Sequence, residues 1–381
     1  MSEQAVQTGR STTQPGLKLD YDVIVIGAGV AGIYQIKRLT DAGIRATVLE
    51  AHEDLGGTWY KNRYPGARFD SESFTYGYSF SQELLDEWDW SEQFSPQPET
   101  LRYLNYVADK FSLRQYMQFG CRVESMIFND DTDSWALHLS DGRTLTTRFV
   151  VTALGILSMP TLPSFEGMDD FKGLSFHPFH WPHDQPDLTG KRVACIGTGA
   201  TAIQFIPEVA KVAGQLTVFQ RRANWAAPLN NDRISREEMA KIRARYDEIF
   251  AACARTPGGF EHEPDRRGFY DVTPEERREL WDRLYDERGF GIWLCNFVEI
   301  FTDEAANAEF SEYIADRIRA RVNDPVLAEK LIPKDHGFGI QRVPLETGYF
   351  ETYNRDNVEL VDSAATPIVR VTENGLCTTD R

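Results

Sequence analysis

Two glycine-rich turns, each lying between a short strand and a helix, constrain the fold of this chain most. The first turn follows the apolar, β-branched run 21–27 and opens the helical pattern of residues 29–42, after which residues 45–50 form a second strand. Residues 191–221 repeat the order of strand, glycine turn, helix and strand. Such a βαβ unit of about 30 residues joins parallel strands. The sequence therefore predicts an α/β fold with two Rossmann-like dinucleotide-binding domains.

The first turn has the spacing of a dinucleotide-binding site. Gly27, Gly29 and Gly32 form a GxGxxG pattern, which allows a tight turn, close approach of the backbone to a pyrophosphate, and packing of the helix on the strand. The N-terminus of the helix adds free N–H groups for the phosphates. Glu50 ends the second strand, where its carboxylate can accept hydrogen bonds from ribose hydroxyls. Because Glu50 would repel a 2′-phosphate, we expect FAD or NAD at this turn.

The stretch after Glu50 favours FAD over NAD. A glycine pair ends at Gly57 and is followed by Thr58 and Trp59, and in flavoproteins with two dinucleotide sites such a pair lies near the flavin. We therefore assign Gly57, Thr58 and Trp59 to the FAD side. A glycine-rich turn without a ligand is the alternative.

The second turn differs from the first in the charge that follows it. Its residues are Gly197, Thr198, Gly199, Ala200 and Thr201. Arg221 and Arg222 follow the second strand of this unit, at the place where the first unit has Glu50. A guanidinium there can pair with the 2′-phosphate of a ribose, so we expect NADPH at this site. An exposed arginine pair on a solvated loop is the alternative.

FAD and NADPH on one chain imply the transfer of a hydride from the nicotinamide to the flavin. The five cysteines are scattered and form no CxxC pair, which argues against a dithiol acceptor and a zinc ribbon, so we expect no metal. O2 then becomes the leading electron acceptor. Scattered cysteines also suit a reducing cytoplasm, where we expect the protein to be.

Charge and apolar content argue against two classes of partner. The formal net charge is −17, whereas nucleic-acid binding depends on clustered Lys and Arg, so we expect no nucleic acid. No apolar run approaches the roughly 20 residues of a membrane span. Residues 1–20 lack the apolar core of a secretory signal. We therefore expect no membrane association, and the sequence leaves the oligomeric state open.

Three further segments carry a resemblance to a known family. Residues 171–182 match the pattern FxGxxxHxxxWP, residues 56–70 match GGxWxxxRYPGxxxD, and residues 336–342 (HGFGIQR) are similar to a catalytic-arginine segment. The fixed positions of the first pattern are Phe171, Gly173, His177, Trp181 and Pro182. From about Tyr21 to its last residue, the chain resembles the type I Baeyer–Villiger monooxygenases, which depend on FAD and NADPH.

The resemblance implies a mechanism and roles for particular residues. NADPH would reduce FAD, and O2 would form a C4a-peroxyflavin that attacks a ketone, cyclic or bulky and apolar, to give an ester or a lactone. Arg342 is implied as the catalytic residue, because a cation that stays protonated stabilises a peroxide anion. Asp70 is implied to lie on the FAD side and to position Arg342. His177 and Trp181 are implied to be linker residues rather than an acid or a base.

The pattern of elements suggests how the chain divides. The Pro-rich segment 159–168 looks like a crossing between domains. We expect an FAD-binding domain of residues 1–158 and 344–381, and an NADPH-binding domain of residues 159–343. A mainly helical insertion, rich in Arg, Glu and Ala, is expected at about 232–331 in the second domain.

Two departures from the family pattern affect these expectations. Gln341 stands where many relatives carry a second basic residue associated with the NADPH phosphate, which leaves more of the recognition to Arg221. The chain also ends at Arg381, whereas family members continue, so we expect an incomplete FAD-binding domain, weak FAD binding and little activity. The alternatives are a flavin monooxygenase that oxidises nitrogen or sulfur, and a catalytically incomplete nucleotide-binding fragment.

Overall fold

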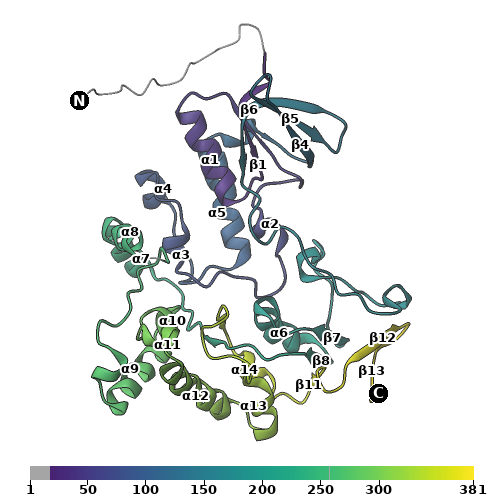
Figure 1. Ribbon diagram of the computed structural model, residues 1–381, viewed down its shortest axis with the longest axis vertical. Helices are drawn as coiled ribbons and strands as arrows, with labels where there is room; N and C mark the ends of the chain where they lie inside the picture. The colour runs from purple at the N-terminus through teal and green to yellow at the C-terminus, as the bar shows by residue number, and fades with distance from the viewer. Residues whose placement is uncertain (1–17, 257) are drawn as a thin grey trace, which may run out of the picture. The chain divides into compact units, whose positions relative to one another are not determined.

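The computed structural model describes residues 18–256 and 258–381, which form two compact units (Figure 1). Unit 1 comprises the described residues up to Tyr60 together with Leu104–Ser158. Unit 2 comprises Lys61–Tyr103 and Met159–Arg381. Within the part of the chain that the structure describes, no helix has the length and apolar character to cross a membrane.

Unit 1 is built on a six-stranded sheet with the strand order β3-β2-β1-β6-β5-β4. Its strands are β1 (Tyr21–Ile26), β2 (Ala46–Leu49), β3 (Met117–Gln118), β4 (Val123–Asn129), β5 (Ser134–Leu139) and β6 (Thr144–Thr152). β1, β2, β3 and β6 pair in parallel, whereas β4–β5 and β5–β6 are antiparallel. Helix α1 (Val30–Asp41) joins β1 to β2 and packs on both strands. The predicted order of strand, glycine turn, helix and strand is thus confirmed.

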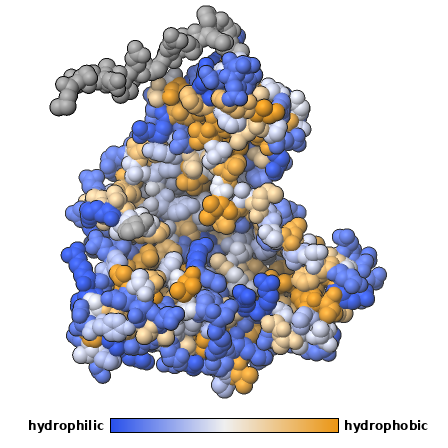
Figure 2. Space-filling view, in the orientation of Figure 1, coloured by the Kyte–Doolittle hydropathy of each residue, from blue (hydrophilic) through white to orange (hydrophobic). Residues whose placement is uncertain are grey.

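Burial explains why these segments form a sheet covered by a helix. Ile24 and Val48 are fully buried in β1 and β2, as expected for apolar strands of a parallel sheet. Ile33 and Ile36, one turn apart on α1, are also fully buried. In contrast, the β4–β6 part of the sheet leaves apolar side chains exposed, and Figure 2 shows hydrophobic surface where Figure 1 labels these strands.

Unit 2 contains the second βαβ unit, in a three-stranded parallel sheet with the order β11-β8-β7. The strands are β7 (Arg192–Ile196), β8 (Gln215–Gln220) and β11 (Val358–Asp362), and helix α6 (Ala200–Val212) joins β7 to β8. Two smaller pairs are β9 (Ala227–Pro228) with β10 (Leu345–Glu346), which is parallel, and the hairpin of β12 (Ile368–Thr372) with β13 (Gly375–Thr378).

The strand pairing places two segments differently from the sequence-based division. Residues 344–381 were expected in the first domain, but β10 and β11 pair with strands of unit 2. Residues 61–103 also group with unit 2 rather than with the rest of 1–158. The reason is that a five-residue strand such as β11 can extend either sheet, and its own sequence does not specify which one.

The predicted helical insertion at 232–331 corresponds to a run of helices in unit 2. These are α7 (Arg236–Ala244), α8 (Tyr246–Arg255), α9 (Pro274–Asp286), α10 (Gly291–Leu294), α11 (Glu299–Thr302), α12 (Glu304–Arg321) and α13 (Pro325–Leu331). Helix α9 begins with a capping box, in which Thr273 and Glu276 satisfy each other's backbone N–H groups. Trp281 and Phe310 pack against each other in the buried core.

Among the residues that the structure describes, five further α-helices lie outside the two βαβ units and the helical insertion. They are α2 (Thr58–Lys61), α3 (Ser73–Tyr76), α4 (Gln82–Glu87), α5 (Gln97–Lys110) and α14 (Tyr349–Thr352). Helix α14 packs on α6 and α12 within unit 2. Helix α6 therefore has the second glycine turn at its N-terminus, and helix α14 from the C-terminal part of the chain packs on it.

Candidate functional site

The first glycine turn of unit 1 is held by contacts that only glycine allows. Gly27 has φ = +104°, and a Cβ there would lie 2.6 Å from the carbonyl oxygen of Ala153. A Cβ on Gly32 would lie 1.8 Å from the oxygen of Gly27, so helix α1 packs directly on the turn. Gly29 is the N-cap of α1 and offers no side-chain cap. The N-cap residue therefore does not block the N-terminus of α1.

The glycine pair after β2 folds back onto this turn. The N–H of Gly56 donates to the oxygen of Ala28 at 2.9 Å. Gly57 has φ = +53°, and a Cβ there would lie 2.8 Å from the Cα of Gly29. Thr58 is exposed and Trp59 is buried at the start of α2. The residues of unit 1 that we assigned to the FAD side thus lie around the backbone of the first glycine turn.

Glu50 is buried beside the same turn. One carboxylate oxygen accepts from the N–H of Ala28 at 2.7 Å, and the other accepts from the N–H of His52 at 2.9 Å. These bonds fix the carboxylate at the carboxyl end of β2, where a ribose binds in Rossmann-like folds. Each oxygen retains a lone pair that can accept a bond from a hydroxyl.

The second glycine turn, in unit 2, is open where the first is closely packed. A Cβ on Gly197 or Gly199 would meet nothing within 4 Å. Gly199 is the N-cap of α6 without a side-chain cap, and Ala200 and Thr201 form the first turn of the helix. Thr198 is buried and donates through its hydroxyl to the oxygen of Arg222 at 2.9 Å. This contact ties the turn to the end of β8.

The two arginines after β8 have different surroundings. Arg222 approaches Asp335 at 3.6 Å, and both side chains are largely exposed. Arg221 is also exposed, and among the residues that the structure describes it has no carboxylate partner. Arg221 is therefore the more available cation for a phosphate.

Asp70 and Arg342 meet in unit 2, although 272 positions separate them in the chain. An Nη2 of Arg342 donates to Oδ2 of Asp70 at 2.7 Å. The side chain of Asp70 is only 3% exposed, whereas that of Arg342 is 59% exposed. Burial raises the pKa of the Asp70 carboxyl, and the charge and hydrogen bond of Arg342 oppose that rise. The pair thus presents a cation whose anionic partner is hidden from solvent.

Helix α6 holds Asp70 through a residue that the sequence did not point to. Gln204 donates from Nε2 to the oxygen of Arg68 at 2.9 Å and, at 3.5 Å, to Oδ1 of Asp70. The hydroxyl of Tyr64 donates to Oε1 of Gln204 at 2.9 Å. Burial raises the pKa of Tyr64 to about 12, so this hydroxyl keeps its proton. A Cβ on Gly66 would lie 2.6 Å from the oxygen of Gln204, so the segment lies tightly on the helix.

The fingerprint segment contacts the same region through Trp181. Its indole N–H donates to Oε1 of Gln185 at 2.9 Å, and Nε2 of Gln185 donates to the oxygen of Arg63 at 3.3 Å. The buried Trp181 ring packs on Phe205 of α6, with ring centroids 6.1 Å apart. Gln185 was not singled out from the sequence, because a lone glutamine after Trp-Pro has no distinctive signal.

The other fingerprint residues make local contacts. His177 caps a short 3-10 helix, because its Nδ1 accepts from the N–H of Phe179 at 3.1 Å. Burial and the neighbouring His180 lower the pKa of His177. A Cβ on Gly173 would lie 2.6 Å from the ring of Phe171, which explains the glycine. Pro182 follows Trp181 directly and extends the turn.

The segment before Arg342 is fixed to helix α12 by Asn307. A Cβ on Gly337 would lie 1.6 Å from Oδ1 of Asn307, and Nδ2 of Asn307 donates to the oxygen of Phe338 at 2.9 Å. Ser311 adds a hydrogen bond to the N–H of Phe338 at 2.9 Å. Together these contacts anchor the loop that carries Arg342.

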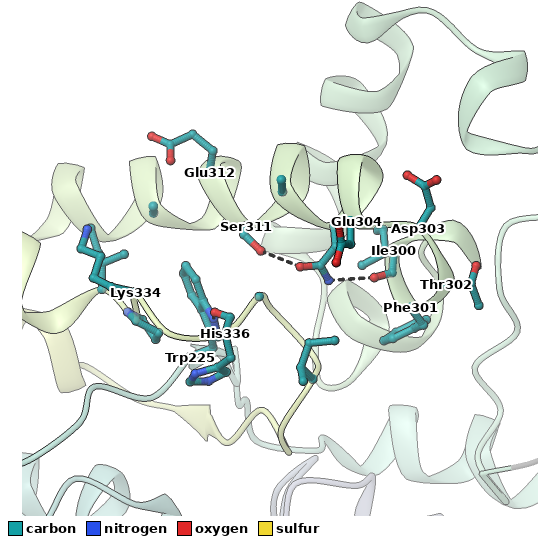
Figure 3. A pocket seen from close by; sticks show the side chains of 17 residues that line it. Trp225, Ile300, Phe301, Thr302, Asp303, Glu304, Ser311, Glu312, Lys334 and His336 are labelled. Carbon is teal, nitrogen blue, oxygen red and sulfur yellow. Dashed lines mark hydrogen bonds between the residues drawn. The ribbon is translucent and has the colours of Figure 1, made fainter.

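A cavity of about 690 Å³ lies beside this anchored segment (Figure 3). Its lining includes Trp225, Ser311, Lys334 and His336. Figure 3 shows one hydrogen bond within α12, from Ser311 to Asn307, and one from Asn307 to the carbonyl oxygen of Ile300. Of the described residues, neither Arg342 nor Asp70 lines the cavity. This cavity is therefore separate from the Asp70–Arg342 pair.

Comparisons with known proteins agree on the class of protein. Residues 20–239 match the family model described as flavin-binding monooxygenase-like. The chain is 46% identical over 365 residues to 2-oxo-Δ3-4,5,5-trimethylcyclopentenylacetyl-CoA monooxygenase of Pseudomonas putida. It is 39% identical over 360 residues to a Baeyer–Villiger monooxygenase of Pseudooceanicola batsensis. A crystal structure of OTEMO in complex with FAD and NADP superposes with a TM-score of 0.93 at 46% identity.

The matches extend over nearly all of this chain but only part of the relatives. The alignments cover 94% of the chain against both monooxygenases, and 67% and 65% of those two proteins respectively. The OTEMO match covers 96% of this chain and 69% of that one. The chain thus spans about two thirds of the length of the proteins that it resembles.

Proposed function

Because the chain belongs to the family of flavin-dependent Baeyer–Villiger monooxygenases, we propose that it uses FAD, NADPH and O2 to insert an oxygen atom beside the carbonyl of a ketone. The product would be an ester or a lactone. The observation that carries this proposal is the pair of Asp70 and Arg342, in which a buried carboxylate holds an accessible guanidinium.

The two glycine turns fit two different dinucleotides. The first turn, with its uncapped helix N-terminus and the buried Glu50, suits a dinucleotide that has free ribose hydroxyls, and we assign FAD to it. The second turn is open, and Arg221 is free to pair with a 2′-phosphate, so we assign NADPH to it. A crystal structure of the relative OTEMO is described as a complex with FAD and NADP, which supports this pair of cofactors.

The chemistry divides between the cofactor and the protein. Bound FAD would pass two electrons from NADPH to O2 and so activate the oxygen for attack on a carbonyl. The N–H groups of the Arg342 guanidinium that do not bond to Asp70 can stabilise negative charge that develops on an oxygen atom. Asp70 orients Arg342, and Gln204 and Leu345 donate hydrogen bonds to Asp70. His177 serves as a cap and not as an acid or a base.

We further propose a cyclic or bulky apolar ketone as the substrate. The Pseudomonas putida relative is named for a 2-oxo compound with a cyclopentenyl ring, which supports a cyclic ketone.

We assign the two cofactors to the two units of the chain: unit 1 is the FAD-binding domain, and unit 2 is the NADPH-binding domain with its helical insertion. We place the protein in the cytoplasm, because its described cysteines are free and scattered.

Product analysis under labelled O2 tests the activity. The purified chain is incubated with excess FAD, NADPH and cyclohexanone in ¹⁸O2, and the products are analysed by mass spectrometry. The excess of FAD compensates for the weak FAD binding expected of this chain, and we expect each molecule of lactone that forms to contain one ¹⁸O atom. An Arg342→Gln variant should lose lactone formation by at least about a hundredfold. The matched control is Arg236→Gln, which changes an exposed arginine of the same unit and should leave lactone formation unchanged.

Two further outcomes decide against this function. A thioether converted to its sulfoxide, with no lactone from any of a panel of cyclic ketones, would assign the chain to the sulfur-oxidising class. NADPH binding without any FAD binding would identify a nucleotide-binding protein without this chemistry.

The cofactor assignment has its own test. Binding of NADPH and NADH is measured by fluorescence for the wild type, Arg221→Ala and Arg222→Ala. We expect Arg221→Ala to weaken NADPH binding by about tenfold and to leave NADH binding unchanged, because one charged hydrogen bond is worth about 1.5–3 kcal/mol in favourable sites. Arg222→Ala should have the smaller effect, because Arg222 also pairs with Asp335. Equal loss for both nucleotides would contradict the assignment of the 2′-phosphate to Arg221.

A further inference from the structure

Three reactive side chains from distant parts of unit 2 form a hydrogen-bonded row away from the glycine turns. Nε2 of His262 lies 2.8 Å from Oε1 of Glu72, and Nδ1 of His262 lies 3.5 Å from Sγ of Cys295. The side chains of Glu72 and His262 are only 13% and 14% exposed. Cys295 is part-buried and free. A carboxylate, an imidazole and a thiol therefore follow one another in contact.

The backbone around Glu72 turns its carboxylate toward the histidine. Glu72 precedes helix α3 as its N-cap with extended backbone, and its side chain does not cap that helix. Gly289, at φ = +71°, leaves room for the carboxylate, since a Cβ there would lie 3.1 Å from Oε1 of Glu72. The other oxygen, Oε2, is buried and makes no hydrogen bond to the described residues. The charge of Glu72 is thus directed at His262.

This order of groups decides which nitrogen faces the thiol. The carboxylate of Glu72 accepts from Nε2–H of His262, so Nδ1 carries the lone pair and can accept the proton of Cys295. Burial opposes the charged imidazolium, but hydrogen bonds to Cys295 and Glu72 and their charges raise the pKa of His262 to about 10. These contacts place an imidazole nitrogen that can accept a proton directly beside the thiol of Cys295, with the carboxylate of Glu72 on the other side of the ring.

The surroundings of two other cysteines do not activate them. Burial raises the pKa of Cys195 to about 12. Burial, and the charges of Glu261 and Glu72, raise the pKa of Cys253. A metal does not explain the row either, because among residues 18–256 and 258–381 no group of three or more His, Cys, Asp and Glu is arranged to hold one.

We propose that Cys295 is a nucleophilic thiol that reacts with hydrogen peroxide, with His262 as its proton acceptor and Glu72 as the residue that orients His262. This is a modification site in addition to the proposed monooxygenase chemistry, and it does not depend on it. Cys295 is neither fully buried nor fully exposed, and the reaction requires only that a small oxidant reaches the sulfur.

The reaction balances with peroxide as the only oxidant. The Cys295 thiolate attacks one oxygen of hydrogen peroxide, an S–O bond forms and the O–O bond breaks. The leaving hydroxide takes the proton that His262 received from the thiol, which gives water. The sulfur is oxidised by two electrons to a sulfenic acid, and the peroxide is reduced by two electrons.

The first test follows alkylation of each cysteine in the native wild-type chain. Iodoacetamide is added for different times from pH 5.5 to 9, and labelled peptides are quantified by mass spectrometry. An ordinary thiol is about 1% thiolate at pH 6.5. Because Nδ1 of His262 lies beside the thiol and can accept its proton, we expect Cys295 to react about five- to tenfold faster than the part-buried Cys377 at that pH. A rate for Cys295 that equals that of Cys377 and follows its pH profile would overturn the proposal.

Variants separate the roles of the two partners. His262→Gln should lower the Cys295 rate at pH 6.5 by about fivefold or more and restore an ordinary thiol pH profile. Glu72→Gln should shift the profile in the same direction, and Glu72→Asp should restore part of the rate. Cys253→Ser is the matched control and should leave the Cys295 profile unchanged. Circular dichroism verifies that each variant is folded, and the wild-type profile decides the question if a variant is not.

Peroxide treatment completes the test. Brief exposure to hydrogen peroxide followed by dimedone, which traps sulfenic acids, should label Cys295 ahead of the other four cysteines. Labelling that is spread evenly over the cysteines, or that His262→Gln does not reduce, would contradict the assignment.

Discussion

Gly57→Ala tests whether the first dinucleotide site depends on a rigid approach of two backbones. Gly57 has φ = +53°, and a Cβ there would lie 2.8 Å from the Cα of Gly29. An ordinary contact begins at 3.4 Å, so one backbone must move by about 0.6 Å. The left-handed conformation costs alanine about 1–2 kcal/mol, and overpacking adds about 1–3 kcal/mol. We expect the free energy of unfolding of unit 1 to fall by about 2–5 kcal/mol.

Gly43→Ala is the matched control for this substitution. Gly43 lies in the same unit with φ = +71°, but a Cβ there would meet nothing within 4 Å. It should therefore show only the conformational cost of about 1–2 kcal/mol. The difference between the two variants isolates the approach of Gly57 to Gly29.

Hydrogen exchange of peptides from β1 and α1, with urea unfolding alongside, measures both effects in unit 1. In the same samples we expect Gly57→Ala to weaken FAD binding more than Gly43→Ala, because the displaced backbone belongs to the site that we propose for FAD. Equal destabilisation by the two variants would show that the turn adapts at no cost, and the argument for a rigid cradle would be wrong.

Three further predictions concern the other groups described above. Gly199 has φ = −78° and open space for a Cβ. Gly199→Ala should therefore change the free energy of unfolding of the apoprotein by no more than about 0.5 kcal/mol, as measured by thermal unfolding. It should weaken NADPH binding about tenfold or more, as measured by titration. Asp70→Asn should lower ketone-dependent NADPH oxidation by about tenfold or more while NADPH binding is retained, because Arg342 loses its charged partner; unchanged turnover would contradict its positioning role. The pKa of His262 is raised to about 10, above the usual 6.5, so its ion pair stabilises the fold fully below about pH 6.5 and this stabilisation is lost as the pH rises through 10. The difference in melting temperature between the wild type and His262→Gln should therefore shrink from pH 6 to pH 10, and a constant difference would count against the ion pair.

Local chemistry made the two turns and their helices predictable from the sequence. Gly27 and Gly32 occupy positions where a Cβ would collide with backbone, so their spacing records the geometry of the turn. Glu50 was expected at the end of β2, and it lies there, although its hydrogen bond to the N–H of Ala28 was not foreseen. The helical insertion was predictable because Arg, Glu and Ala, in which it is rich, are residues that favour helices.

Long-range pairing was much harder to predict. Nothing in the residues themselves connects Asp70 with Arg342, and only the family resemblance suggested the pair. Gln204 and Gln185 act through single side-chain amides, and such a residue looks the same in sequence whether it faces solvent or a buried partner. The position of β11 beside β8 depends on which sheet edge is available, and that is a property of the whole fold.

Helix α6 connects the second glycine turn to the Asp70–Arg342 pair. Its first residue, Ala200, adjoins the second glycine turn, and Gln204 follows about 6 Å further along the helix axis. Gln204 holds Asp70, and Asp70 holds Arg342. A displacement of the N-terminus of α6 would therefore reach the carboxylate of Asp70 through a single side chain, Gln204. We expect a ligand bound at the second glycine turn to be able to change the orientation of Arg342 without touching it.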